Sequence, residues 1–117
     1  MNYLTDTHIY IWFTEDSPQL SKRIRAIIED ESNTVFISMT SFYEMAIKIK
    51  LGKLVLGKSL RAYMNDAKAH NFSILLISEN HITTYERVPL IEIHRDPFDR
   101  LLIATALFEN LAILTAG

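Results

Sequence analysis

The sequence contains no cysteine among its 117 residues. This absence excludes a disulfide scaffold, a zinc–thiolate site and a cysteine nucleophile, and it fits a reducing compartment. No apolar run approaches the roughly 18 residues that a membrane-crossing helix needs. The N-terminal segment lacks a basic region and carries Asp6 and His8 inside its apolar stretch, unlike a signal peptide. We therefore expect a cytoplasmic protein.

Several catalytic motifs are absent as well. The sequence has no Walker loop, no G-x-S-x-G elbow and no histidine pair with the zinc-ligand spacing of H-E-x-x-H. We interpret the four histidines as ordinary polar or loop residues: His8, His70, His81 and His94. With 49% hydrophobic and 22% charged residues, the chain suits one globular domain with one core, and its net charge of −2 indicates no particular partner.

The chain contains an alternation of short apolar strands and helical patterns. We expect strands at residues 2–5, 34–38, 72–78 and 111–116. We expect a helical turn from residue 8 and helices at residues 17–31, 39–52, 59–70, 78–88 and 97–110. In the helix at 17–31, Ser17 is the predicted N-cap and Pro18 the first helical residue.

This alternation predicts an α/β sandwich built on a parallel sheet. The segment at 72–78 is continuously apolar, which is typical of a strand buried on both faces of such a sheet. In parallel sheets, ligands collect at the carboxyl ends of the strands, near a switch in strand order. The residues that follow the strands are therefore the place to look for a site.

Acidic residues from three chain segments are expected at that place. Asp6 directly follows the first strand, Glu44 lies in the helix after the second, and Asp96 and Asp99 begin the last long helix. Carboxylates gathered from separate segments suit a hard cation such as Mg²⁺, which prefers oxygen ligands and keeps several waters. They also suit two-metal sites that act on phosphodiesters.

Each acid has a structural explanation as well. Asp6 could cap the following helix, and an exposed Glu44–Lys48 pair at i,i+4 would account for Glu44. Asp96, which precedes a proline, reads as a helix start. Capping explains Asp99 less well, because it stands on a helix that is apolar on nearly every side. Burying a carboxylate there is costly unless it is paired or bound to metal.

Basic residues gather between positions 48 and 68 of this mildly acidic chain. Such a stretch can form a local phosphate-binding surface, although a solvated lysine face is the plainer interpretation. The candidate phosphate contacts are Lys48, Lys50 and Lys53.

Three segments resemble the PIN-domain toxins of bacterial VapBC toxin–antitoxin pairs. They read "LTDTHIYIW", "SFYEMAIKIKLGKL" and "HRDPFDRLLIATAL", stand in the order of the family, and the last is the most specific. The resemblance covers essentially the whole chain. It implies a single PIN-like domain over residues 1–117, a three-layer α/β/α sandwich with a central, mainly parallel sheet.

The same resemblance implies an activity and partners. It implies an endoribonuclease toxin that depends on Mg²⁺ or Mn²⁺ and hydrolyses phosphodiester bonds of tRNA or other structured RNA. It implies a homodimer and a VapB-type antitoxin. By position, the acids of the catalytic site are Asp6, Glu44 and Asp99, with Asp96 adjacent, and the metal is expected on Asp6 and Asp99.

The sequence departs from the family near its end. Relatives usually carry a further aspartate in a Thr-x-Asp arrangement, but here Thr115 is followed by Gly117 at that position, and the chain stops where relatives continue. Either the domain lacks its C-terminal end, or the alignment with the family is off by a residue or two. In both cases a complete second metal site and full activity are in question. The alternative is a catalytically impaired PIN-like module that binds RNA or an antitoxin without cleaving. A phosphatase of the haloacid dehalogenase type ranks last, because it would need an aspartate where His8 stands.

Overall fold

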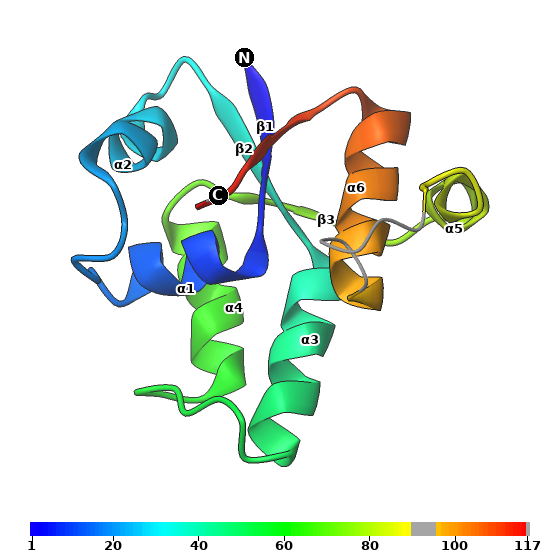
Figure 1. The fold of residues 1–117 in the computed structure, drawn as a ribbon. Coiled ribbons are helices and arrows are strands. Elements are labelled where there is room, and N and C mark those ends of the chain that lie inside the picture. Colours follow the sequence, from blue (N-terminus) through cyan, green and yellow to red (C-terminus); the bar gives the residue numbers. More distant parts are fainter. Residues whose placement is uncertain (90–95, 117) are drawn as a thin grey trace.

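The computed structural model describes residues 1–89 and 96–116. Its strands are β1 (Asn2–Thr5), β2 (Thr34–Ser38), β3 (Ser73–Leu75) and β4 (Ala112–Leu114). They form one sheet in the order β3-β2-β1-β4, in which every neighbouring pair is parallel (Figure 1). The prediction of an α/β fold with a parallel sheet is confirmed.

The helices are α1 (Thr7–Thr14), α2 (Lys22–Glu29), α3 (Met39–Lys50), α4 (Leu60–Ala69), α5 (Glu79–Tyr85) and α6 (Pro97–Glu109). Ser59 caps α4 and Asp96 caps α6, as the sequence predicts. The predicted start of α2 at Ser17 is wrong. Ser17 closes a local turn, in which its hydroxyl accepts from the Gln19 N–H and its carbonyl from the Leu20 N–H. The helix begins only after Ser21, whose hydroxyl accepts from the Ile24 N–H.

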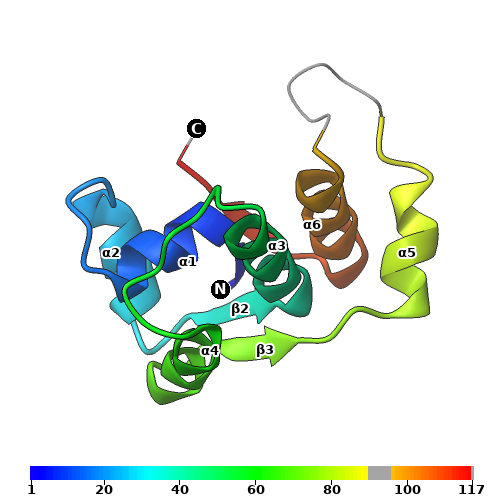
Figure 2. The same cartoon turned by 90° about the horizontal axis from the view of Figure 1, so that it is seen from below.

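The two faces of the sheet are covered separately, which makes three layers. Alternate strand residues point to opposite sides, so Leu4 packs with Leu102 and Ala106 of α6, while Ile37 belongs to a larger core with α1 to α4. In Figure 2, α5 and α6 stand together on one side of the molecule, with α1 and α2 on the other. Among residues 1–89 and 96–116, no helix combines the length and apolarity needed to cross a membrane.

The segment at 72–78 differs from its prediction of a strand buried on both faces. Only Ser73–Leu75 pairs, at the edge of the sheet, and Leu76 and Ile77 are 66% and 40% exposed. The reason lies in β2, whose last residue, Ser38, already pairs with Leu75. Beyond it the chain turns into α3, so no strand remains for residues 76 and 77 to pair with.

The strand order reverses at β1. The chain moves from β1 to β2 and β3 on one side, and then returns to add β4 on the other. Ligands of open α/β sheets bind at such a switch point, beyond the carboxyl ends of the strands. The backbone of Asp6 lies there, because its N–H donates to the Leu114 carbonyl at 3.0 Å.

Candidate functional site

Asp6 stands at the turn from β1 into α1. Its carboxylate accepts from the Ile9 N–H at 3.0 Å, so the residue caps α1, and it is half-buried at the carboxyl edge of the sheet. Negative charge at a helix N-terminus is stabilised by the helix dipole. The structural explanation of Asp6 as a cap is therefore correct, and it leaves the second carboxylate oxygen for other partners.

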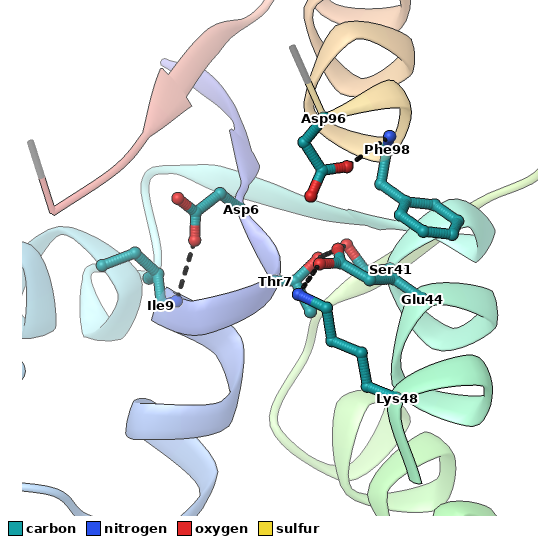
Figure 3. Close-up of polar contacts among 8 residues, drawn as sticks. All are labelled: Asp6, Thr7, Ile9, Ser41, Glu44, Lys48, Asp96 and Phe98. Atoms are coloured by element: carbon teal, nitrogen blue, oxygen red, sulfur yellow. Dashed lines mark hydrogen bonds and ion pairs between the residues drawn. The ribbon is translucent and has the colours of Figure 1, made fainter. Parts of the chain in front are cut away.

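Glu44 of α3 is tied to α1 by a cluster of polar side chains. Thr7 donates to Glu44 Oε1 at 2.7 Å, a 2.8 Å hydrogen bond joins Thr7 Oγ1 and Ser41 Oγ, and Lys48 Nζ lies 2.6 Å from Glu44 Oε2 (Figure 3). We call Thr7, Ser41, Glu44 and Lys48 the Glu44 cluster. Glu44 is only 2% exposed, so the prediction of an exposed Glu44–Lys48 pair is half right: the pair forms, but its carboxylate is buried.

Lys48 brings a cation into this acidic region. Partial burial lowers its pKa, but the hydrogen bond and charge of Glu44, together with Asp96 and Asp99, outweigh that effect and hold the pKa above its ordinary value. Lys48 is therefore charged at neutral pH. It neutralises Glu44, and its ammonium is held in place by an acceptor that cannot move into solvent.

The start of α6 carries the other two acids. Asp96 accepts from the Phe98 N–H at 2.8 Å, and Pro97 occupies the first turn, so this residue caps the helix as expected. Asp99 is the third residue of the helix and is exposed. The cost that the sequence attaches to burying a carboxylate on α6 is therefore avoided, because Asp99 stands on the exposed side of the helix start. Within the described part of the chain, its carboxylate accepts no hydrogen bond.

The charges around Asp99 show that the four acids share one region. Loss of hydration, followed by repulsion from Asp96, Glu44 and Asp6, raises the pKa of Asp99 above its ordinary value, and Lys48 opposes that rise only in part. Each of these groups must be near enough to act on Asp99 electrostatically. The structure thus brings together the acids that the sequence nominated from three segments.

Their chemistry fits a hard cation, although the side chains do not enclose one. Among residues 1–89 and 96–116, no group of three or more Asp, Glu or His side chains is placed to hold a metal ion. Glu44 has both oxygens bonded, whereas Asp6 and Asp96 each use one oxygen as a cap. Mg²⁺ commonly takes one or two carboxylates directly and keeps waters. Asp99 and the second oxygen of Asp6 are the donors that suit it best.

The three candidate lysines separate in the structure. Lys48 and Lys53 line a cavity of about 240 Å³ together with Glu44 and Thr7, between α1 and α3. Lys50 lines a different cavity of about 560 Å³, formed by the end of α3, the following loop and the start of α4. No pattern in the sequence indicates this split, because it depends on how the chain turns after α3.

One histidine differs from its prediction as a polar or loop residue. His81 lies in α5 and is 1% exposed; its Nε2 lies 2.6 Å from Glu109 Oε2 of α6, and its Nδ1 accepts from the Ser78 N–H. His81 therefore joins α5 to α6, and its ring nitrogens bond with Ser78 and Glu109 and not with the four acids of the candidate site. His94 and Gly117, the latter at the expected late aspartate position, lie outside the described residues.

A parallel α/β domain with acidic side chains at its switch point is the class that this fold and site define. Within that class, the PIN domain family model matches residues 3–117 of the sequence. The chain belongs to the PIN domain family.

Solved structures support the same fold. The chain is similar to VapBC2 from Rickettsia felis, crystallised with a DNA fragment from its promoter (TM-score 0.64, 17% identity, 98% of this chain and 87% of that chain covered). It is similar to a toxin–antitoxin complex from Klebsiella pneumoniae (0.61, 21%, 97% and 84%). It is also similar to FitAcB from Neisseria gonorrhoeae (0.62, 23%, 100% and 88%). No curated protein matches the chain.

Proposed function

We propose that this chain is an endoribonuclease toxin of a toxin–antitoxin pair that hydrolyses RNA phosphodiester bonds with Mg²⁺ or Mn²⁺. PIN domains are generally nucleases, and the structural neighbours are toxin–antitoxin complexes. The observation that carries the proposal is Asp99, an exposed carboxylate with a raised pKa beside three other acids at the switch point of the sheet. A bound cation relieves this repulsion, which gives the arrangement a chemical purpose.

Each residue then has a role in holding the site. Asp99 and Asp6 are the proposed metal ligands, and Asp96 and Glu44 add negative charge nearby. The metal supplies, when bound, the positive charge that orients and polarises a phosphodiester and makes water a better nucleophile. Glu44 holds the ammonium of Lys48 at the edge of this region, where it offsets part of the negative charge of the acids. The helix N-terminus helps to keep Asp99 ionised, as a ligand must be.

We propose structured RNA such as tRNA as the substrate, a VapB-type antitoxin as the partner, a homodimer as the assembly and the cytoplasm as the location. Exposed apolar side chains on α3, Tyr43 and Ile49, support a surface for protein association. The antitoxin partner extends from the toxin–antitoxin neighbours to this chain, and the other three proposals rest on the resemblance to the VapBC toxins. Light scattering of the purified protein measures its molar mass and so tests whether it is a homodimer.

The cleavage test compares the purified chain on tRNA and on a mixed RNA pool, with Mn²⁺ and with EDTA. Asp6→Asn and Asp99→Asn should each lower the rate by more than about 100-fold, since even groups that only support metal ligands cost 10–100-fold. Asparagine keeps the cap at position 6, so Asp6→Asn should fold normally. Glu29→Gln, which removes an exposed acid at the end of α2, is the charge-matched control. Activity that survives both substitutions, or EDTA, contradicts the proposed site.

The second candidate is a PIN-like module that binds RNA or an antitoxin without cleaving. It is favoured by the structural use of three acids: Asp6 and Asp96 as caps, and Glu44 in a closed cluster. Calorimetric titration with Mn²⁺ separates the two. Binding at millimolar concentration or tighter that is lost in Asp99→Asn supports the nuclease, and no heat of binding supports the module.

A further inference from the structure

The cavity between α1 and α3 adjoins the acidic site but is not used by the metal proposal. Thr7, His8 and Ile11 come from α1, Glu44, Met45 and Lys48 from α3, and Lys53 and Leu54 from the loop that follows. Ile11 and Met45 are buried and make an apolar floor, whereas His8 and Lys53 are exposed at the rim. At about 240 Å³ the cavity is smaller than the roughly 300–1,000 Å³ of drug-sized sites, and suits one base or one sugar-phosphate unit.

The turn after α3 places Lys53 at this rim. Gly52 adopts a left-handed backbone with φ of +72°, which glycine reaches without steric cost. The chain folds back there, and the N–H groups of Lys53 and Leu54 both donate to the Lys48 carbonyl, at 2.8 and 3.2 Å. Lys53 therefore lies against the last turn of α3, beside Lys48, and does not continue away from the site.

The two lysines of the cavity differ in availability. Lys48 is paired with Glu44 at 2.6 Å, so most of its positive charge is offset by a carboxylate of the protein. Lys53 is exposed, and no carboxylate in residues 1–89 or 96–116 forms an ion pair with it. In this cavity the charges of Glu44 and Lys48 offset each other, and Lys53 supplies the positive charge that can bind a phosphate.

His8 adds an aromatic surface to the same rim. Its ring lies 6.1 Å from that of Trp12, one turn further along α1, with a 52° angle between the planes. Unstacked bases of single-stranded RNA pack on aromatic side chains, histidine included. Because His8 and Lys53 line the same cavity, one nucleotide can place its base on His8 and its phosphate on Lys53.

We propose that this cavity is a subsite for one nucleotide of single-stranded RNA next to the cleaved bond, with Lys53 on its phosphate and His8 against its base. This inference rests on the proposed action on RNA. Stacking of this kind accepts any of the bases but needs an unpaired one. The subsite therefore selects unpaired RNA over duplex and positions the strand at the acids. Lys50, on the other cavity, takes no part.

The test measures binding of a short fluorescent oligo(U) RNA to the full chain by anisotropy, in EDTA at about pH 8, across a series of salt concentrations. Lys53→Gln should reduce the slope of log affinity against log salt by ~0.7, the value for one phosphate contact on a single strand. That corresponds to roughly fivefold weaker binding near 0.1 M salt. His8→Ala should weaken binding by at least about fivefold with the slope unchanged, because stacking releases no counterions.

Matched variants keep the result interpretable. Lys22→Gln removes an exposed charge on α2 and should leave slope and affinity unchanged, and Lys53→Arg should restore the slope. Unchanged slope in Lys53→Gln, or no binding by the parent chain, overturns the subsite. A parent chain that binds in this pattern but does not cleave in Mn²⁺ overturns the nuclease and leaves the subsite standing. If the parent chain cleaves RNA but neither Lys53→Gln nor His8→Ala changes binding, the subsite is overturned and the nuclease proposal stands.

Discussion

Glu44 and Asp99 carry the same charge in the same region, yet their surroundings are opposite. Glu44 is 2% exposed, and both of its oxygens are bonded, to Thr7 and to Lys48. Asp99 is exposed, accepts no hydrogen bond within the described residues, and has a pKa raised by lost hydration and by three neighbouring carboxylates. The Glu44 cluster is closed, whereas the start of α6 is open and loaded with like charge.

This difference separates stability from binding. The Glu44–Lys48 ion pair lies within α3, and the hydrogen bond from Thr7 to Glu44 joins α1 to α3. Removing one partner of a buried charge is costly. An exposed carboxylate among other carboxylates lowers the stability of the fold. Such arrangements, and the perturbed pKa values that they cause, occur mainly at functional sites. We infer that the Glu44 cluster fixes α1 against α3, and that the α6 start presents a carboxylate to a ligand.

The largest expected effect is on the closed side. Glu44→Ala leaves Thr7 and Lys48 without their acceptor and should lower the free energy of unfolding by about 1–3 kcal/mol. Urea denaturation followed by circular dichroism measures this. Glu44→Gln keeps an acceptor for Thr7 but removes the charge, so it should lose less. If Glu44→Ala is as stable as the parent chain, the cluster does not join the two helices.

A smaller loss is expected at the cap of α6. Asp96→Ala removes the acceptor for the Phe98 N–H and should cost about 1 kcal/mol, typical of a lost N-cap. Asp96→Ser restores a capping oxygen without the charge and should recover most of that loss. Thermal melts of the three proteins provide the comparison. Equal loss in both variants would show that the charge of Asp96, and not its cap, supports the fold.

The smallest effect, with the opposite sign, is expected at Asp99. Its pKa is raised in the folded state, so its ionisation weakens the fold above that pKa, and this penalty disappears as pH falls through it towards the ordinary value near 4. Asp99→Asn should therefore gain less than about 1 kcal/mol at neutral pH, because solvent screens exposed charges. The gain should vanish in acid.

A second aspartate serves as the contrast for that measurement. The side chain and backbone of Ser32 lower the pKa of Asp30, so Asp30 stabilises the fold above its ordinary pKa and loses this effect as pH falls. Asp30→Asn should thus lose stability at neutral pH, where Asp99→Asn gains it. Unfolding curves at several pH values test both signs. A loss of stability in Asp99→Asn at neutral pH would contradict the repulsion described here.

Much of the fold follows from local patterns. The start of α6 was predictable because a cap acts within two residues of itself, and the strand at 34–38 because β-branched and aromatic residues stand together. The same reasoning failed at Ser17, where a turn competes with a helix for the same hydroxyl. It failed at residues 76 and 77 because a strand needs a partner, which is set by the end of β2.

The candidate site was predictable in composition but not in arrangement. Glu44 stands off the apolar stripe of its own helix, so only the contact with Thr7, 37 residues earlier, decides that it is buried. His81 is similar, because its partner Glu109 is 28 residues away. Neither contact leaves a signal within the window of residues that a helix or strand pattern uses.

The sequence by itself determined the class of this protein, a parallel α/β domain of the PIN family with acids at the ends of its strands and helices. The α/β class follows from caps, apolar periodicity and strand–helix alternation, which are short-range properties of the chain, and the family follows from the resemblance of three of its segments. Only the tertiary structure decided which carboxylate is closed and which is open, and which lysine faces the acids. Those properties depend on packing and summed charge between segments distant in the chain, where the free energy of a side chain is set by its neighbours in space.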